Sequence, residues 1–299
     1  MFTYGILANN EWRSAWMDEG LTSYQTLWAR GQVPQARIGL QSPPAPARGG
    51  YRALAVAPTD EEAAAIESAR LVARGIAQPI GTPAHQFREF ALYNEMVYTR
   101  ASDMYSGLRD VLGDSAFTQF LRGYYARWGM RHVDEEAMRA EAERAWGGRD
   151  LSWFFRQWVH GTGLVDYSAE RADKRKLKDG WETDVTVRRV GSYQHPVRIG
   201  LRTDSGWVVV PLPDGTATKQ LVTIPTRLEP RAVQLDPFNT SGDWRPENDV
   251  TAFGDAWRPS LDQWNWDWPF LDQAKRGGTL HLHRPTLWYS DHGGATIGW

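Results

Sequence analysis

Several features that define other protein classes are missing from this chain of 299 residues. Cysteine is absent, which excludes a disulfide framework and a thiolate metal site. No apolar run approaches the roughly 20 residues that a membrane-spanning helix requires. The first residues carry neither the basic start nor the cleavage site of a signal peptide, an absence that says nothing about export if the true start lies upstream. The formal net charge of -2 argues against an extended basic surface and so against nucleic acid as a partner.

Tryptophan, in contrast, is abundant, with 16 residues in the chain. Its large ring buries a great deal of apolar surface, so we expect most of these residues to lie in a core. The length suggests about two domains and provides enough chain for a sizeable core. The composition therefore predicts a folded protein whose core is rich in aromatic rings.

The first 30 residues, and above all residues 10–20, predict a helix with one buried face. Trp12, Trp16 and Leu21 recur at roughly helical spacing and are expected to pack inward. Glu19 then lies near the same buried side, three residues after Trp16. A carboxylate carried into an apolar environment is costly unless it is paired or bound to a metal. Glu19 therefore needs a partner.

The run Glu11–Tyr24 (EWRSAWMDEGLTSY) resembles the third-ligand helix of the zinc aminopeptidases of the aminopeptidase N type, which are gluzincin metallopeptidases. In that family an H-E-x-x-H helix supplies two histidine ligands and a general-base glutamate. The third ligand is a glutamate within a W-x-(N/D)-E-G pattern, which Trp16–Gly20 matches. The resemblance implies that Glu19 is a zinc ligand and that Asp18 is an acceptor that orients a ligand.

The spacing before Glu19 also matches the family. Residues 1–18 fill the spacer that separates the third ligand from the second histidine, which would fall immediately before Met1. Phe2–Gly5 matches the aromatic-rich segment ending in Tyr-Gly that often follows that histidine. The chain would then hold one protein ligand, whereas a catalytic zinc site takes about three and an open position for water. We therefore expect a fragment, or a misassigned start, of a zinc peptidase that is inactive alone.

A second motif follows in residues 93–104. Tyr98-Thr99-Arg100-Ala101 resembles the family pattern Y-x-K-(G/A), with arginine in place of lysine and alanine at the small-residue position. In the family this pattern opens a helix and its tyrosine points at the scissile carbonyl. A phenol can donate a hydrogen bond to the developing oxyanion without carrying charge at neutral pH. The resemblance implies this role for Tyr98, although Tyr93 and Tyr105 are close enough in sequence to be mistaken for it.

The predicted fold class is α+β, and the resemblance divides the chain into three parts. Residues 1–163 would be the helical C-terminal portion of a thermolysin-like catalytic domain, with an inserted loop over 31–58. Alternating apolar residues and turns rich in glycine and aspartate predict a small β-sandwich over 164–240. Residues 241–299 would be a tryptophan-rich linker and the start of a truncated β module, ending in a hairpin.

Four aspartates are expected to cap helices: Asp60, Asp114, Asp134 and Asp150. Asp150 opens a run through Trp158 that resembles the family's D-L-x-x-F-F-x-x-W helix.

Three histidines outside the ligand spacing are assigned structural roles. His160 follows the Trp158 helix, where a capping or core role is favoured over a metal role. His281 and His283 alternate onto one strand face and could chelate a metal, but no third ligand of convincing spacing follows them.

The whole protein implied by the resemblance would use zinc to remove residues from the N-termini of peptide substrates. The family strand that reads the substrate amine is not found in this chain. Such a protein would be exported, periplasmic or membrane-associated, while the localisation of this chain stays open. The alternative is a non-catalytic peptide- or protein-interaction module that retains the peptidase scaffold.

Overall fold

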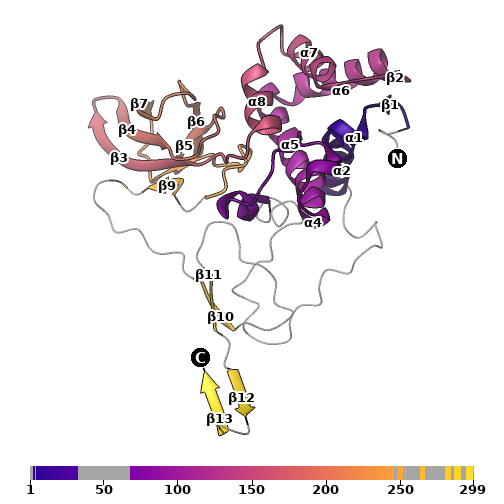
Figure 1. Cartoon of the computed structure of the whole chain (residues 1–299). Helices are drawn as coiled ribbons and strands as arrows, with labels where there is room; N and C mark the ends of the chain where they lie inside the picture. The colour runs from indigo at the N-terminus through magenta and orange to yellow at the C-terminus, as the bar shows by residue number, and fades with distance from the viewer. Residues whose placement is uncertain are drawn as a thin grey trace.

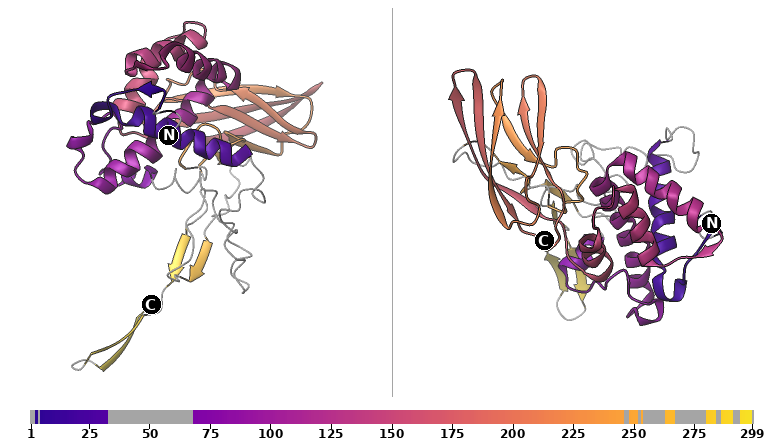
Figure 2. Two further views of the ribbon diagram at one scale, coloured as in Figure 1. Left: turned by 90° about the vertical axis from the view of Figure 1, so that its right-hand side faces the viewer. Right: turned by 90° about the horizontal axis from the view of Figure 1, so that it is seen from above.

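The computed structural model describes residues 3, 5–32, 68–245, 248–251, 253, 263–266, 280–283, 286–290 and 294–298. A helical part and a β-sandwich lie side by side in Figures 1 and 2. Most of the predicted loop 31–58 and the predicted cap Asp60 lie outside the described residues. No helix of the described part is long and apolar enough to cross a membrane.

The helical part contains two very short strands, one 3-10 turn and one π-helical segment besides its α-helices. In chain order these elements are β1 (Leu7–Ala8), α1 (Glu11–Ser14), α2 (Trp16–Gln32), a helical segment over 68–73, η2 (Ala84–Gln86), α4 (Phe90–Asn94), the π-helix η3 (Glu95–Arg100), α5 (Ala101–Leu112), α6 (Asp114–Trp128), β2 (Arg131–His132), α7 (Glu135–Ala145) and α8 (Ser152–His160).

The single helix predicted for the first 30 residues is two helices, α1 and α2, which meet at Ala15. The side chain of Asn10 caps the start of α1. Trp16 is buried as predicted, with 1% of its surface exposed. The prediction that Trp12 packs inward is wrong, because Trp12 is 62% exposed. The break at Ala15 takes Trp12 off the buried stripe of α2, and its ring stacks on His85 instead.

One predicted helix cap is confirmed and two are wrong. The Asp134 side chain accepts a hydrogen bond from a backbone N–H in the first turn of α7, as expected of an N-cap. Gly113, with φ 78°, occupies the cap position of α6, and Asp114 is the first helical residue. Leu151 occupies the cap position of α8, while Asp150 accepts hydrogen bonds just before it from Ser152. Asp150 thus binds the first turn of α8 without being its cap.

The β-sandwich consists of two antiparallel sheets. One has the strand order β3-β4-β7 and the other β6-β5-β8-β9. Their strands are β3 (Tyr167–Leu177), β4 (Gly180–Arg189), β5 (Arg198–Thr203), β6 (Gly206–Pro211), β7 (Lys219–Thr226), β8 (Ala232–Leu235) and β9 (Val250–Thr251).

Alternation along the strands decides which side chains face the core. In β4, Val185 and Val187 are buried between partly exposed neighbours, and Ile199 and Leu201 of β5 are fully buried. Gly206 has φ 119° in the predicted turn between β5 and β6, a conformation that favours glycine. Because β9 pairs with β8, the sheet continues past the predicted boundary at residue 240.

Four strands follow in the tail: β10 (Gln263–Trp266), β11 (Leu280–His283), β12 (Thr286–Ser290) and β13 (Gly294–Gly298). The last two form an antiparallel pair, as expected of the predicted hairpin. Trp264 and Trp266 lie in β10, which pairs in parallel with β11, where an irregular linker was expected.

Two charged clusters join the helical part to the sandwich. Asp110 of α5 lies 2.9 Å from His195 Nε2 and accepts a hydrogen bond of 2.9 Å from Arg198. The guanidinium of Arg100 lies 4.5 Å from the ring centroid of Trp158 and 5.7 Å from that of Tyr193, which lies between β4 and β5, and it donates a 2.6 Å hydrogen bond to the carbonyl oxygen of Gly163. Both clusters are largely buried, so they fix the two parts relative to each other.

Acid is expected to weaken the first of these clusters. Burial alone would raise the pKa of Asp110, but the hydrogen bonds and charges of His195 and Arg198 outweigh it and lower the pKa below its usual value. Asp110 therefore stabilises the fold above the unfolded-state pKa of about 4, and this contribution is lost as the pH falls through the lower folded-state value. The free energies of urea unfolding of the wild type and of Asp110→Asn should differ above about pH 4, and this difference should shrink as the pH falls below about 4. A difference that grows as the pH falls below about 4 would contradict this assignment.

Candidate functional site

The two residues expected to carry the chemistry, Glu19 and Tyr98, meet in the structure. The Tyr98 hydroxyl donates a 2.6 Å hydrogen bond to Glu19 Oε1. Both side chains are half-buried, and they come from α2 and η3, 79 residues apart in sequence. The short distance is that of a hydrogen bond from a hydroxyl to a carboxylate, which is stronger than one between neutral groups. A phenol donor and a carboxylate are thus hydrogen-bonded to each other in the helical part.

The family motif predicts that Tyr98 opens a helix. In the structure Tyr98 instead lies inside the π-helix η3. The helical run begins at Phe90 with α4, passes through η3 and continues into α5 from Ala101. π-Helical turns are rare and occur frequently at functional sites. The backbone that holds Tyr98 is therefore irregular at the point where its hydroxyl reaches Glu19.

The surroundings of Tyr98 keep its hydroxyl protonated. Burial raises the pKa of Tyr98 well above that of a free phenol, and the hydrogen bond to Glu19 and the charge of Glu19 raise it further. At neutral pH Tyr98 is therefore a neutral hydrogen-bond donor, as an oxyanion partner must be.

The structure separates Tyr98 from the two tyrosines that could be mistaken for it. Tyr105 is fully buried and donates a 2.9 Å hydrogen bond to the carbonyl oxygen of Met17, so it belongs to the core. Tyr93 is half-buried, and its ring meets that of Tyr98 edge-on at a centroid distance of 6.4 Å. Burial raises the pKa of Tyr93, and the charge of Glu19 adds to the effect. Tyr93 is therefore next to the pair without being part of it.

Asp18 is buried and bound to Asn9, a residue that sequence reasoning missed. Asn9 Nδ2 donates a 2.7 Å hydrogen bond to Asp18 Oδ1 and a 3.0 Å hydrogen bond to the carbonyl oxygen of Ser14. Burial raises the pKa of Asp18 to about 6, although the hydrogen bond from Asn9 opposes the shift. Asp18 therefore holds together the junction of α1 and α2, and its role in orienting a metal ligand stays a prediction.

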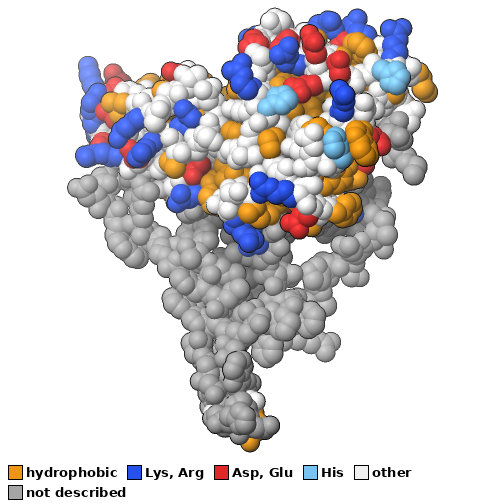
Figure 3. All heavy atoms as spheres, viewed as in Figure 1, with side chains coloured by type: hydrophobic (Ala, Val, Ile, Leu, Met, Phe, Trp, Pro, Cys, Tyr) orange, Lys and Arg blue, Asp and Glu red, His pale blue; other side chains and the backbone are white. Residues whose placement is uncertain are grey.

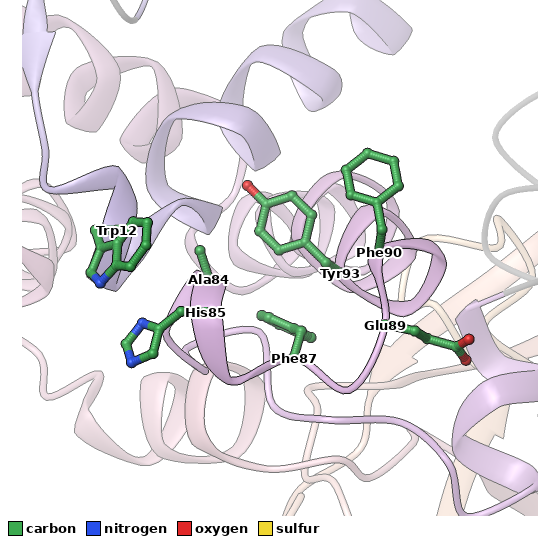
Figure 4. A pocket seen from close by; sticks show the side chains of 7 residues that line it. All are labelled: Trp12, Ala84, His85, Phe87, Glu89, Phe90 and Tyr93. Carbon is green, nitrogen blue, oxygen red and sulfur yellow. The ribbon is translucent and has the colours of Figure 1, made fainter.

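An aromatic cavity of about 420 Å³ opens beside Tyr93. Figure 4 shows Trp12 and His85 on one side of it and Tyr93 and Phe90 on the other. Its lining residues are Trp12, Ala84, His85, Phe87, Glu89, Phe90 and Tyr93. Trp12 and Phe90 are 62% and 78% exposed. Hydrophobic side chains also gather on the helical part in the space-filling view, among interspersed acidic and basic ones (Figure 3). The periodicity of the sequence could not predict this cavity, because its lining combines a residue of α1 with residues more than 70 positions later in the chain.

The chain does not by itself provide a complete metal site in its described part. Among the described residues, no group of three or more histidine, aspartate or glutamate side chains is placed to hold a metal ion. Glu19 offers one carboxylate, whereas a catalytic zinc site takes about three protein ligands. His160 is the last residue of α8, is exposed and lies 3.0 Å from Glu135, so of the two structural roles expected for it, capping or core, the core role is excluded. The side chains of His281 and His283 lie outside the described part.

Comparison with known proteins gives a family match and several structural likenesses. The model of the peptidase family M1 domain matches residues 5–158. A search of curated protein sequences gives no match. The structure is similar to aminopeptidase A of Legionella pneumophila, solved in complex with aspartic acid, with a TM-score of 0.52, 13% identity, and coverage of 81% of this chain and 25% of that one. This likeness supports the predicted α+β class, which is confirmed.

A second solved structure is a mutant M1 zinc metallopeptidase of Deinococcus radiodurans bound to a Tyr-Ser-Ala substrate. It has a TM-score of 0.35 and 23% identity, with coverage of 50% of this chain and 28% of that one. The chain therefore spans about a quarter of the length of the solved structures that it matches.

Proposed function

Because the chain belongs to peptidase family M1, whose domain it matches over residues 5–158, we propose that it forms part of a zinc aminopeptidase site. In this proposal Glu19 is one of the zinc ligands and Tyr98 is the hydrogen-bond donor to the scissile carbonyl oxygen. The family match supports a peptidase, and zinc is its expected cofactor, as the sequence predicted. The other ligands would come from residues that are not among those described.

The observation that carries the proposal is the 2.6 Å contact between Tyr98 and Glu19. A ligand carboxylate and an oxyanion donor must lie within a few ångströms of the same reacting carbonyl, and here they touch. Zinc, when bound, supplies Lewis-acid polarisation of the carbonyl and a more acidic water. Tyr98 would donate a hydrogen bond to the oxygen on which negative charge develops, and burial keeps its proton on the phenol. Such a donor is not consumed in the reaction.

A peptide is the proposed substrate, cleaved at its first bond. The family match supports hydrolysis of peptide bonds, and the aromatic cavity is lined by Tyr93, whose ring contacts that of Tyr98. Restriction to N-terminal residues rests on the resemblance in the sequence. Export of the whole protein and its association with a membrane also rest on that resemblance and stay predictions.

Zinc content tests the assignment of Glu19. The purified chain of 299 residues should retain well below one equivalent of zinc after dialysis, because a single carboxylate binds zinc weakly, and it should cleave no aminoacyl-anilide. In the peptidase that carries H-E-x-x-H together with this chain, zinc should be stoichiometric. Glu19→Ala should weaken its binding by more than about 100-fold, since even partners that only orient a ligand are worth about 10- to 100-fold.

Glu11→Ala is the matched control, because Glu11 is an exposed acid on the neighbouring helix α1 and should leave zinc binding unchanged. Stoichiometric zinc in Glu19→Ala would remove Glu19 from the ligand set. The nucleotide sequence upstream of the Met1 codon separates the peptidase from a non-catalytic interaction module, because only the peptidase requires an open frame that encodes H-E-x-x-H.

A further inference from the structure

The residues next to Glu19 and Tyr98 pack against each other at unusually short range. Gly20 follows Glu19 in α2, and Ala101 begins α5 three residues after Tyr98. Both are buried. A Cβ atom added at Gly20 would lie 2.4 Å from the Cβ of Ala101 and 3.2 to 3.3 Å from its backbone carbons. Carbon atoms prefer separations of about 3.5 to 4.0 Å, so any side chain at position 20 would force the two helices apart.

Local helix formation does not explain a glycine at this position. Gly20 lies in the interior of α2, where glycine is less favourable than alanine because its backbone loses more conformational freedom. Its backbone is not in the left-handed region either, since it is not among the glycines with positive φ. The close approach of Ala101 is therefore the feature that requires Gly20.

The contact is connected to the functional pair through very short stretches of backbone. Glu19 is covalently bonded to Gly20, and Tyr98 is one helical turn before Ala101. Any increase in the distance between α2 and the junction of η3 with α5 would act directly on the hydrogen bond between Tyr98 and Glu19. The 2.6 Å hydrogen bond would weaken if the two oxygen atoms moved apart by more than a few tenths of an ångström, because O–H···O bonds in proteins lie between about 2.5 and 3.0 Å.

We propose that Gly20 and Ala101 are positioning residues. Because glycine has no side chain and alanine has only a methyl group, their close packing sets the distance between Glu19 and Tyr98. The geometry of the contact stands on its own, and its importance for catalysis rests on the proposed function. The size of the two side chains together, and not the identity of either one, then decides whether the phenol reaches the carboxylate.

A double-mutant cycle in the 299-residue chain tests this without relying on zinc or on activity. The cycle combines Glu19→Ala with Tyr98→Phe and measures their coupling from urea unfolding. In the parent chain the coupling should be roughly tenfold in the unfolding equilibrium constant, as expected for a half-buried hydrogen bond to a charged group. In a Gly20→Ala background it should fall below about twofold, because the pair is already separated.

Exchanging the two side chains supplies the matched control. The variant with both Gly20→Ala and Ala101→Gly removes the 2.4 Å clash and leaves only the contacts of 3.2 and 3.3 Å, so most of the coupling should return. Ala101→Gly alone should keep the full coupling, because it creates space without a clash. If Gly20→Ala does not fold, the exchange variant still tests the proposal, because the proposal requires that this variant folds and shows the coupling between Glu19 and Tyr98.

Coupling that is unchanged in Gly20→Ala, or absent in the exchange variant, would overturn the inference. In the peptidase, kcat should follow the coupling, falling in Gly20→Ala and recovering in the exchange variant with little change in KM. If the coupling behaves as expected and kcat does not follow it, the positioning contact stands and the proposed catalytic role of the pair fails.

Discussion

Replacing Tyr98 with phenylalanine is expected to lower kcat of the peptidase by about 100- to 1000-fold while leaving KM nearly unchanged. The substitution removes one hydroxyl that donates to the oxygen gaining charge, and it keeps the ring that packs against Tyr93. Loss of a donor that acts only in the transition state appears in kcat and not in substrate affinity. Steady-state kinetics with an aminoacyl-anilide, at several substrate concentrations, measures both constants.

Tyr93→Phe is the matched control for this experiment. Tyr93 lies five residues earlier in the chain, in ring contact with Tyr98, and is the other half-buried tyrosine at this surface. Its loss of a hydroxyl should have a much smaller effect on kcat. A large fall in Tyr93→Phe together with an unaltered Tyr98→Phe would transfer the oxyanion role to Tyr93.

Arg100→Met should destabilise the 299-residue chain by about 3 kcal/mol, because it removes a buried hydrogen bond from a charged group and a desolvated cation–π contact. Arg100 is 6% exposed, so water cannot replace these contacts in the folded state. The thermal midpoint should fall by about 4 to 6 °C in a calorimetric scan. The unbranched methionine side chain fills much of the same volume, so the loss is chiefly that of the charged group.

The exposed Arg122 of α6 provides the comparison, since Arg122→Met should change the free energy of unfolding by less than about 0.5 kcal/mol. Arg100→Lys keeps the charge without the planar fork and should give an intermediate loss. Equal stability of Arg100→Met and wild type would show that the contacts of Arg100 with Trp158 and Gly163 do not stabilise the packing of η3 against α8 and the segment that follows it.

Patterns that depend on neighbouring residues were predicted well from the sequence. The alternation around Val185 and the glycine turn at Gly206 specify strands and their faces through local geometry alone. The Asp134 cap likewise depends on a side chain and an N–H only three residues apart. These features need no knowledge of the rest of the fold.

Contacts between distant segments could be predicted only where a family pattern existed. Glu19 and Tyr98 were identified by their motifs, and their contact across 79 residues has no signal in periodicity or composition. Trp12 was misplaced because helical spacing assumes an unbroken helix, and the break at Ala15 sends its ring toward His85. The close contact between Gly20 and Ala101 could not be predicted from the sequence either, although each of the two residues belongs to one of the motifs. Sequence spacing thus identified the two residues to which a function is proposed, but not the packing that positions them.

The π-helical geometry of η3 has a consequence for deletions in this segment. In a regular α-helix, residues five apart point about 140° away from each other, so Tyr93 and Tyr98 would face different directions. A turn closed by i→i+5 hydrogen bonds brings residues five apart toward a common side, and the two rings are in contact here. The wider turn depends on the backbone and not on the side chains of the two tyrosines. Deleting one residue from this segment should therefore restore a regular α-helical turn and point positions 93 and 98 in different directions.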